Sequence, residues 1–192
     1  MNVLIIFAHP NKESFCSAIK NTLFESLKAN KNDIRVHDLY NDKFNPKLSK
    51  IELTGESKKI SDFKLVKNYQ ADIKWANTII IIHPAWWYGA PAILKGYFDR
   101  VLSEGFAFIY KDDEPEPKLT GKNGILIQTF DATEEMEKKL FNEITYKSIF
   151  YTWKYCGVVD WVYKAFFRVN FVTHEQRTSW LQEIVNIGKN IN

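Results

Sequence analysis

Short runs of apolar residues recur along the chain and alternate with longer stretches that mix polar and apolar positions. Residues 78–82 are almost all isoleucine, and residues 3–7 are apolar at every position. A strand that is apolar on both sides is typical of a parallel sheet covered on both faces. We therefore predict buried parallel strands at 3–7 and 78–82, and further strands at 34–39, 124–129 and 158–162.

Between these runs the apolar residues follow helical spacing. Ser14 suits an N-cap, and apolar residues then recur on one face as far as Leu27. Pro91 favours the start of a helix over 91–102, because a first-turn position does not need its missing N–H. Further helices are predicted over 60–75, from 134 onward, over 144–155 and over 173–187, with Thr133 and Thr173 as caps.

Three segments show neither a continuous apolar run nor helical spacing. Residues 40–59 are polar and contain proline, which predicts a long irregular loop of the kind that is often functional. The aromatic residues of 106–110 alternate at period two, as in an extended arm or a short strand, and 111–118 predicts a charged, solvated turn.

The alternation of strands and helices predicts an α/β fold in which one doubly wound domain spans residues 1–192. Five strands favour a parallel sheet of order 2-1-3-4-5 with helices on both faces. The length allows a substantial core, and 45% hydrophobic and 26% charged residues are ordinary globular values.

Composition excludes several classes of function. A net charge of +3 does not indicate a nucleic-acid partner, and the short apolar start and absence of a long apolar run predict neither a signal peptide nor membrane insertion. Cys16 and Cys156 form no disulfide framework or zinc pattern, and both are interpreted as packed residues. We expect a cytoplasmic protein without a metal site.

The first candidate site is the turn after the first strand. A helix N-terminus there offers free N–H groups to a phosphate, and His9, Lys12 and Ser14 could add side-chain donors or charge. Neither a dinucleotide fingerprint nor a P-loop is present. The alternative is that Ser14 only caps the helix and His9 only satisfies loop carbonyls. A second ligand loop on a neighbouring strand favours phosphate binding.

That second loop follows the central strand and comprises Pro84, Ala85, Trp86, Trp87, Tyr88 and Gly89. Its backbone amides and aromatic rings suit the polar edge and the faces of a flavin, although these rings could instead be buried or lie at a subunit contact. Thr129, Phe130 and Asp131, at the carboxyl end of the fourth strand, could serve the same ring.

With these loops placed, the chain resembles the flavodoxin-like NAD(P)H:quinone oxidoreductases. That family includes the modulator-of-drug-activity proteins and the ancillary flavoproteins of potassium efflux systems. The resemblance rests on residues 84–96, on Asp99-Arg100-Val101, on Phe106-Ala107-Phe108-Ile109-Tyr110, and on Ala8-His9-Pro10 with Ser14-Phe15.

The resemblance implies roles for these residues. His9, Ser14, Phe15, Cys16 and Ser17 would hold the flavin phosphate, while Pro84 to Gly89 and Thr129 to Asp131 would line the isoalloxazine. Phe108 and Tyr110 match an aromatic pair that reaches toward the flavin of a partner subunit, which implies a homodimer with the active site at its interface. Arg177 matches a position that meets adenosine where the cofactor is FAD.

The chain also departs from the family. Cys16 stands where many members carry Asn, Phe108 where Tyr is common, and residues 128–131 where a Thr-Thr-Gly-Gly type loop is usual. The Tyr and His that steady the reduced flavin in quinone reductases have no clear match, although Tyr146 and Tyr151 lie in that region.

Together these features predict a two-electron, ping-pong reductase in which NADH or NADPH delivers hydride to flavin N5 and a quinone or related acceptor then takes its place. FMN is favoured over FAD, because the sequence indicates no adenine-binding residue other than Arg177. The alternatives are a flavin-bearing regulatory subunit of a membrane transport system, a one-electron carrier, and a colourless structural protein.

Overall fold

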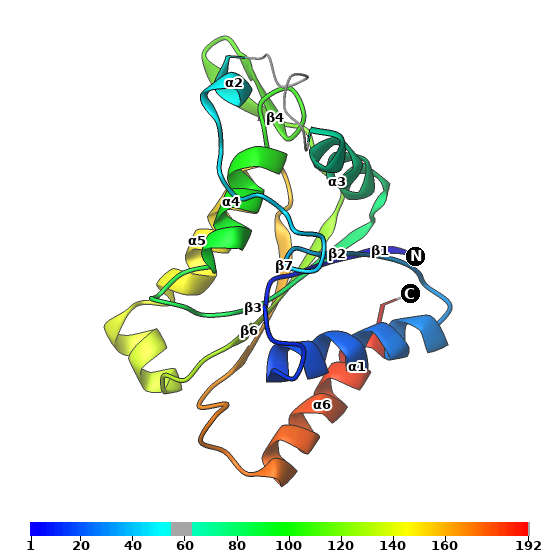
Figure 1. Ribbon diagram of the computed structural model, residues 1–192, viewed down its shortest axis with the longest axis vertical. Helices are drawn as coiled ribbons and strands as arrows, with labels where there is room; N and C mark the ends of the chain where they lie inside the picture. Colours follow the sequence, from blue (N-terminus) through cyan, green and yellow to red (C-terminus); the bar gives the residue numbers. More distant parts are fainter. Residues whose placement is uncertain (55–62, 192) are drawn as a thin grey trace.

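The computed structural model describes residues 1–54 and 63–191. Figure 1 shows a twisted central sheet between two layers of helices. The sheet has five parallel strands in the order β2-β1-β3-β6-β7. Because β6 and β7 are its fourth and fifth strands along the chain, the predicted order is confirmed. The strands are β1 (Asn2–Phe7), β2 (Asp33–Asp38), β3 (Thr78–Pro84), β6 (Asn123–Thr129) and β7 (Asp160–Phe166).

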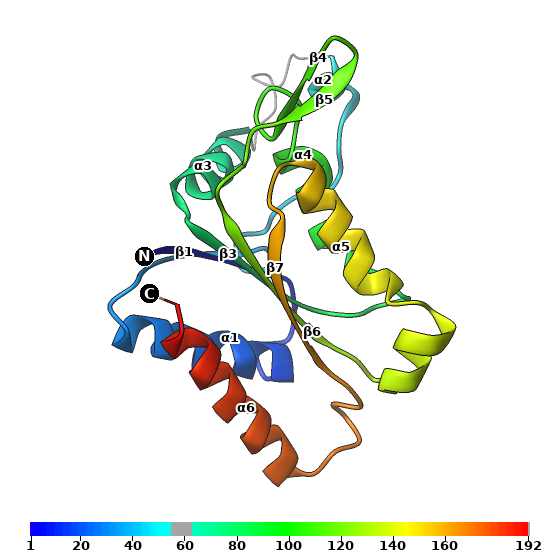
Figure 2. The same cartoon turned by 180° about the vertical axis from the view of Figure 1, so that it is seen from behind.

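The helices divide between the two faces of the sheet, as Figures 1 and 2 show from opposite sides. One face packs against α1 (Phe15–Ala29) and α6 (His174–Lys189). The other packs against α3 (Phe63–Trp75), α4 (Ala92–Val101) and α5 (Ile144–Tyr155). None of the helices among the described residues is long and apolar enough to span a membrane.

Burial on both faces explains why the strands are apolar at every position. Side chains alternate across a strand, so Ile79 and Ile81 enter the core under α4, whereas Ile80 and Ile82 enter the core under α1. All four are fully buried. An alternating polar pattern would place polar groups in one of these two cores.

The predicted charged turn at 111–118 is instead part of a β-hairpin. Strand β4 (Phe108–Lys111) pairs with β5 (Glu114–Pro117) in antiparallel register. Asp112 and Asp113 connect them with φ values of 52° and 63°. Two left-handed residues make the tight turn that matches the twist of a hairpin. The turn was correctly predicted, but the strand that follows it was missed, because its two prolines argue against a strand except at a sheet edge.

The last strand begins later than the predicted 158–162. Gly157, at a φ of 105°, ends α5, and its N–H and that of Val158 donate to the carbonyls of Lys154 and Trp153. This is a glycine helix cap that uses Val158 as its final donor. Val158 is buried where it closes the helix. Strand β7 begins only at Asp160.

The remaining helix predictions hold with adjustments. Ser14 and Thr173 cap α1 and α6 through their side chains. Thr133 caps the acidic helix, whose continuation is one π-helical turn, Met136–Leu140. For the predicted helix over 60–75, α3 begins at Phe63, and residues 60–62 lie outside the described residues.

The described part of the long loop after β2, residues 39–54, packs against α4. It contains a short helix, α2 (Lys50–Leu53), which was not predicted. The Arg100 Nε donates to Glu52 Oε1 at 2.7 Å, and both side chains are nearly inaccessible. A Cβ on Gly96 would lie 2.2 Å from the Pro46 carbonyl oxygen, so α4 needs glycine where the loop crosses it. Residues 55–59 lie outside the described part of the chain.

Two buried histidines are held in the neutral form. His37 Nδ1 lies 2.9 Å from the Tyr97 hydroxyl and its Nε2 lies 3.0 Å from Asp72 Oδ2. One ring nitrogen can therefore accept while the other donates, which suits a neutral ring. Burial lowers the pKa of His37 to about 4, although Asp72 opposes the shift.

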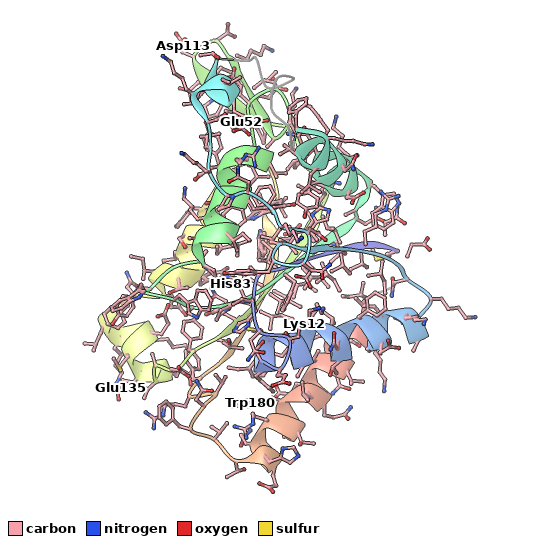
Figure 3. The ribbon with its side chains drawn as sticks, viewed as in Figure 1. Lys12, Glu52, His83, Asp113, Glu135 and Trp180 are labelled. Carbon is pink, nitrogen blue, oxygen red and sulfur yellow. The ribbon has the colours of Figure 1, made fainter. Side chains whose placement is uncertain are left out.

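His83, which is labelled in Figure 3, belongs to β3 and is also held in the neutral form. Its Nδ1 donates to the Pro84 carbonyl at 2.8 Å, and its Nε2 accepts from the Gln128 amide at 3.0 Å. Complete burial lowers the pKa of His83 to about 4.

The free energy of unfolding should fall between about pH 6.5 and about pH 4, because the unfolded chain binds protons at His37 and His83 that the folded chain excludes. Each histidine should cost about 2 to 3 kcal/mol of stability by about pH 4.5, and this cost is absent above the unfolded pKa. Chemical denaturation followed by tryptophan fluorescence at several pH values measures this loss.

His37→Gln should lower stability at neutral pH, since Tyr97 and Asp72 lose their partner, and should remove about half of the histidine-dependent acid loss. His174→Gln is the matched control, because His174 is exposed and its loss should leave the pH profile unchanged. A parent protein whose stability is constant across this window would contradict neutral burial of the two rings.

Candidate functional site

A cavity of about 660 Å³ lies at the carboxyl edge of the sheet, where the loops after β1, β3 and β6 meet. It brings together residues from all three predicted loops. The predicted residues that line it are His9, Ser14, Phe15, Cys16, Pro84, Ala85, Trp86, Thr129, Phe130 and Asp131. In Figure 3 this region lies between the labelled His83 and Trp180, beside the start of α1.

The turn after β1 presents the N-terminus of α1 to this cavity. Ser14 caps the helix by accepting from the Ser17 amide at 3.2 Å. The amides of Phe15 and Cys16 donate to no group among the described residues. Ser17 itself donates to the Asn11 carbonyl, and with Lys12 it lines a neighbouring hollow instead of this cavity.

His9 links this turn to the aromatic loop. Its ring lies edge-on to Trp86, with centroids 5.8 Å apart. His9 Nδ1 lies 3.0 Å from the Asn11 amide nitrogen and 3.1 Å from the Asn11 carbonyl oxygen, so Nδ1 accepts from the amide in one neutral tautomer and donates to the carbonyl in the other. Partial burial lowers the pKa of His9, which favours the neutral ring. His9 Nε2 makes no hydrogen bond to the described residues, and it can donate to a ligand in the tautomer whose Nδ1 accepts from Asn11.

Cys16 joins α1 to the end of β6. Its Sγ lies 3.1 Å from Thr129 Oγ1, and its side chain is 1% exposed. Burial raises the pKa of the thiol to about 12, so it stays protonated at neutral pH. Cys16 is therefore a packed residue rather than a nucleophile. The same conclusion holds for Cys156, whose pKa burial also raises to about 12.

The aromatic loop is a tight turn in a conformation that its residues disfavour. Trp86 and Gly89 exchange two backbone hydrogen bonds of 3.0 and 3.1 Å. The two residues between them, Trp87 and Tyr88, have φ values of 49° and 58°. Left-handed backbone is costly for aromatic side chains, and such strain concentrates at functional sites.

This turn leaves two amides available. The Ala85 amide donates to the Thr129 carbonyl at 2.8 Å, and the amides of Trp86 and Gly89 each donate to the carbonyl of the other residue. In the described part of the chain, the amides of Trp87 and Tyr88 have no hydrogen-bond acceptor. The Trp87 side chain is 96% exposed, whereas the Tyr88 ring packs 4.2 Å from that of Phe141.

The loop after β6 contributes less than its sequence suggests. The Phe130 amide donates to the Phe166 carbonyl, and its ring stacks on Phe167. The Asp131 carboxylate accepts from the Asn170 amide at 2.9 and 3.0 Å. These groups shape the cavity wall but are already hydrogen-bonded or packed.

Phe108 and Tyr110 do not lie at this cavity. They belong to the β4–β5 hairpin, which Figures 1 and 2 show at the opposite end of the molecule from α1 and α6. There the Phe108 ring packs 5.0 Å from Tyr155, whose hydroxyl donates to that of Tyr110 at 3.4 Å. Tyr146 stacks on Tyr163, and Tyr151 is exposed.

The cavity also has a wall that the sequence reasoning largely missed. Arg177, His174, Thr178 and Leu181 of α6 and the preceding loop residue Asn170 line it. Arg177 donates to the carbonyls of Val169 and Val172 at 3.1 and 2.9 Å. Because the loop after β7 leaves from the same edge of the sheet, the predicted topology could have indicated this wall.

The chemistry of the cavity is that of a binding site for an anionic, planar ligand. The unpaired amides of Phe15 and Cys16 lie at a helix N-terminus on the cavity wall, which suits phosphate. Pro84, Ala85 and Trp86 line the cavity, whereas Trp87, Tyr88 and Gly89 do not, so the unpaired amides of Trp87 and Tyr88 lie next to the cavity wall in sequence rather than on it. These donors fit a flavin mononucleotide. Among the described residues, no group of His, Cys, Asp and Glu could hold a metal ion.

The model of a family with a flavodoxin-like fold matches residues 1–186. The chain belongs to this family. An uncharacterized NAD(P)H oxidoreductase of Haemophilus influenzae is 32% identical over 95% of this flavodoxin-like chain and 91% of its own length. A ribosyldihydronicotinamide dehydrogenase [quinone] of Pongo abelii is 28% identical over 97% and 92%.

A solved structure agrees with the fold of this flavodoxin-like chain. The FMN-dependent NADH-azoreductase of Bacillus anthracis, in complex with FMN, superposes with a TM-score of 0.81 at 21% identity, over 100% of this chain and 99% of that one. At this identity the likeness concerns the fold. The sequence relatives place the chain among proteins similar to NAD(P)H:quinone oxidoreductases.

Trp87→Gly should raise the free energy of unfolding of the flavin-free protein by about 0.5 to 1 kcal/mol, because glycine adopts the left-handed backbone freely. The side chain is almost wholly exposed, so little packing is lost. Asp113→Gly, at a similar turn position in the hairpin, should give a similar gain. If Trp87→Gly destabilised the protein while Asp113→Gly stabilised it, the turn at Trp87 would not be strained.

Proposed function

We propose that this protein is a flavin-dependent NAD(P)H:acceptor oxidoreductase that reduces quinones or related acceptors by two electrons in a ping-pong cycle. The observation that carries the proposal is one cavity that is lined by the unpaired amides of Phe15 and Cys16 and by Trp86, the residue that precedes the unpaired amides of Trp87 and Tyr88. Similarity to quinone-reducing relatives supports the same conclusion.

The phosphate of the cofactor would lie at the N-terminus of α1. The amides of Phe15 and Cys16 and the Nε2–H of His9 would donate to its oxygens, and the positive end of the helix dipole would favour its charge. Ser14 holds this end of the helix in place, while Ser17 acts through the turn rather than by direct contact.

The isoalloxazine would lie against the loop of Pro84 to Gly89. The amides of Trp87 and Tyr88 would donate to its polar edge, where negative charge develops on reduction, and would stabilise that charge without reorganising. Thr129 would face the ring through a hydroxyl held by Cys16, and Phe130 and Asp131 would form the wall behind it.

The bound flavin would supply the redox chemistry, accepting hydride at N5 from NAD(P)H and delivering it to the acceptor. No side chain acts as a nucleophile in this proposal, in keeping with the protonated thiol of Cys16. The residues of the chain bind and orient the ring, exclude water with aromatic side chains, and supply fixed donors.

FMN fits the cavity better than FAD. Arg177, the residue that could meet adenosine, already donates to two backbone carbonyls of the preceding loop. We also propose that residues 1–192 form one domain and that two chains form a homodimer. The hairpin of one chain, with Phe108 and Tyr110, would then cover the flavin of its partner, since it lies far from the cavity of its own chain.

The purified protein should be yellow, and its flavin absorption should bleach in one step when NADPH or NADH is added without oxygen. Absorption spectroscopy measures both, and an added quinone should restore the colour. A yellow protein that neither nicotinamide bleaches would contradict the reductase, and a colourless protein that takes up no flavin would contradict the cofactor site.

His9→Ala should weaken FMN binding about tenfold, because one hydrogen bond to a charged phosphate is lost. His174→Ala is the matched control, since His174 lines the same cavity from α6 rather than from the turn after β1. Quenching of flavin fluorescence on binding gives both affinities. Equal losses in the two variants would contradict the proposed position of the phosphate.

A further inference from the structure

A second hollow, of about 670 Å³, lies on the other side of the turn after β1. We call it the basic hollow and define it by Lys12, Lys20, Lys43, Asp38, Tyr40 and Asn41. Its walls come from the start of α1 and from the chain that leaves the end of β2. The labelled Lys12 in Figure 3 marks its position beside α1.

The side chains of the basic hollow carry a surplus of positive charge. Three lysines face one carboxylate, Asp38, whose Oδ1 accepts from the Asn41 amide at 3.2 Å and whose Oδ2 lies 3.6 Å from Lys20 Nζ. Within the described residues, neither Lys12 nor Lys43 forms an ion pair. Two ammonium groups are therefore available to an anion.

The uncharged groups of the hollow can also donate. The Tyr40 hydroxyl makes no hydrogen bond to the described residues, and partial burial raises its pKa, so it remains protonated at neutral pH. The side-chain amides of Asn21 and Asn41 add N–H donors. A hollow with many donors and one engaged carboxylate suits an oxyanion of two charges.

The position of the hollow is that of a nucleotide subsite. It lies at the carboxyl ends of β1 and β2, the edge at which open α/β sheets bind ligands. His9 lines both this hollow and the cofactor cavity, and its ring contacts Trp86. A ligand in the hollow would thus lie beside the proposed flavin site.

We propose that the basic hollow binds a phosphate monoester dianion through Lys12, Lys43 and Tyr40. The source that fits the neighbouring site is the 2′-phosphate of NADPH, an assignment that rests on the proposed function, and free inorganic phosphate is the other source of this chemistry.

Calorimetric titration of the flavin-loaded protein with adenosine 2′-monophosphate, and separately with inorganic phosphate, tests the site. The double variant Lys12→Gln/Lys43→Gln should weaken binding about tenfold for whichever of the two probes the parent protein binds. Lys28→Gln/Lys31→Gln is the matched control. It removes the same charge from the far end of α1, and Lys31 shares the left-handed backbone of Lys43.

Tight binding of adenosine 2′-monophosphate with weak binding of phosphate supports the nucleotide source. Comparable binding of the two supports a site for free phosphate. Absence of binding by either probe, or equal weakening by both double variants, would overturn the proposal, because the effect would then be one of general charge.

A kinetic measurement separates this proposal from the reductase itself. For the nucleotide source, Lys12→Gln/Lys43→Gln should reduce kcat/KM for NADPH about tenfold relative to that for NADH, while the control pair keeps the ratio. If neither nicotinamide reduces the flavin, the proposed function fails, but the titration with the two phosphate probes still decides whether the hollow binds an anion.

Discussion

The rest of the structure depends on a parallel sheet that is buried on both faces. Every side chain of its inner strands must enter one of two cores, so these strands carry almost no polar groups. His83 and Gln128, each one residue before the carboxyl end of its strand, are buried polar exceptions. The Gln128 amide donates to His83 Nε2, although Gln128 Oε1 has no hydrogen-bond partner among the described residues. Polar chemistry is consequently confined to the loops at the carboxyl edge.

At that edge, the strand order decides which loops can share a ligand. Strands β1, β3 and β6 are adjacent, so their loops meet, and contacts between them lock the arrangement: His9 against Trp86, and Cys16 against Thr129. The two sides of the turn after β1 face different hollows, one with unpaired amides and one with unpaired ammonium groups. The N-terminus of α1 thus separates two hollows that offer different hydrogen-bond donors.

The opposite end of the molecule is held together by different contacts. There the long loop after β2 is held to α4 by a buried ion pair, Arg100 with Glu52, and by the close approach of Pro46 to Gly96. A buried pair of this kind needs both partners, since either charge alone would be costly. Helix α2 and the β4–β5 hairpin lie at the end of the molecule opposite α1 and α6.

The sequence by itself determined the strands, their order and the three loops at the carboxyl edge, because a doubly covered sheet needs apolar runs such as residues 78–82 and ends them at Pro84. Local signals such as Ser14 also marked the helix starts. Only the tertiary structure decided that His9 meets Trp86, that Cys16 meets Thr129, and that Lys12 faces the second hollow. These outcomes depend on partners distant in sequence, and no local pattern encodes them.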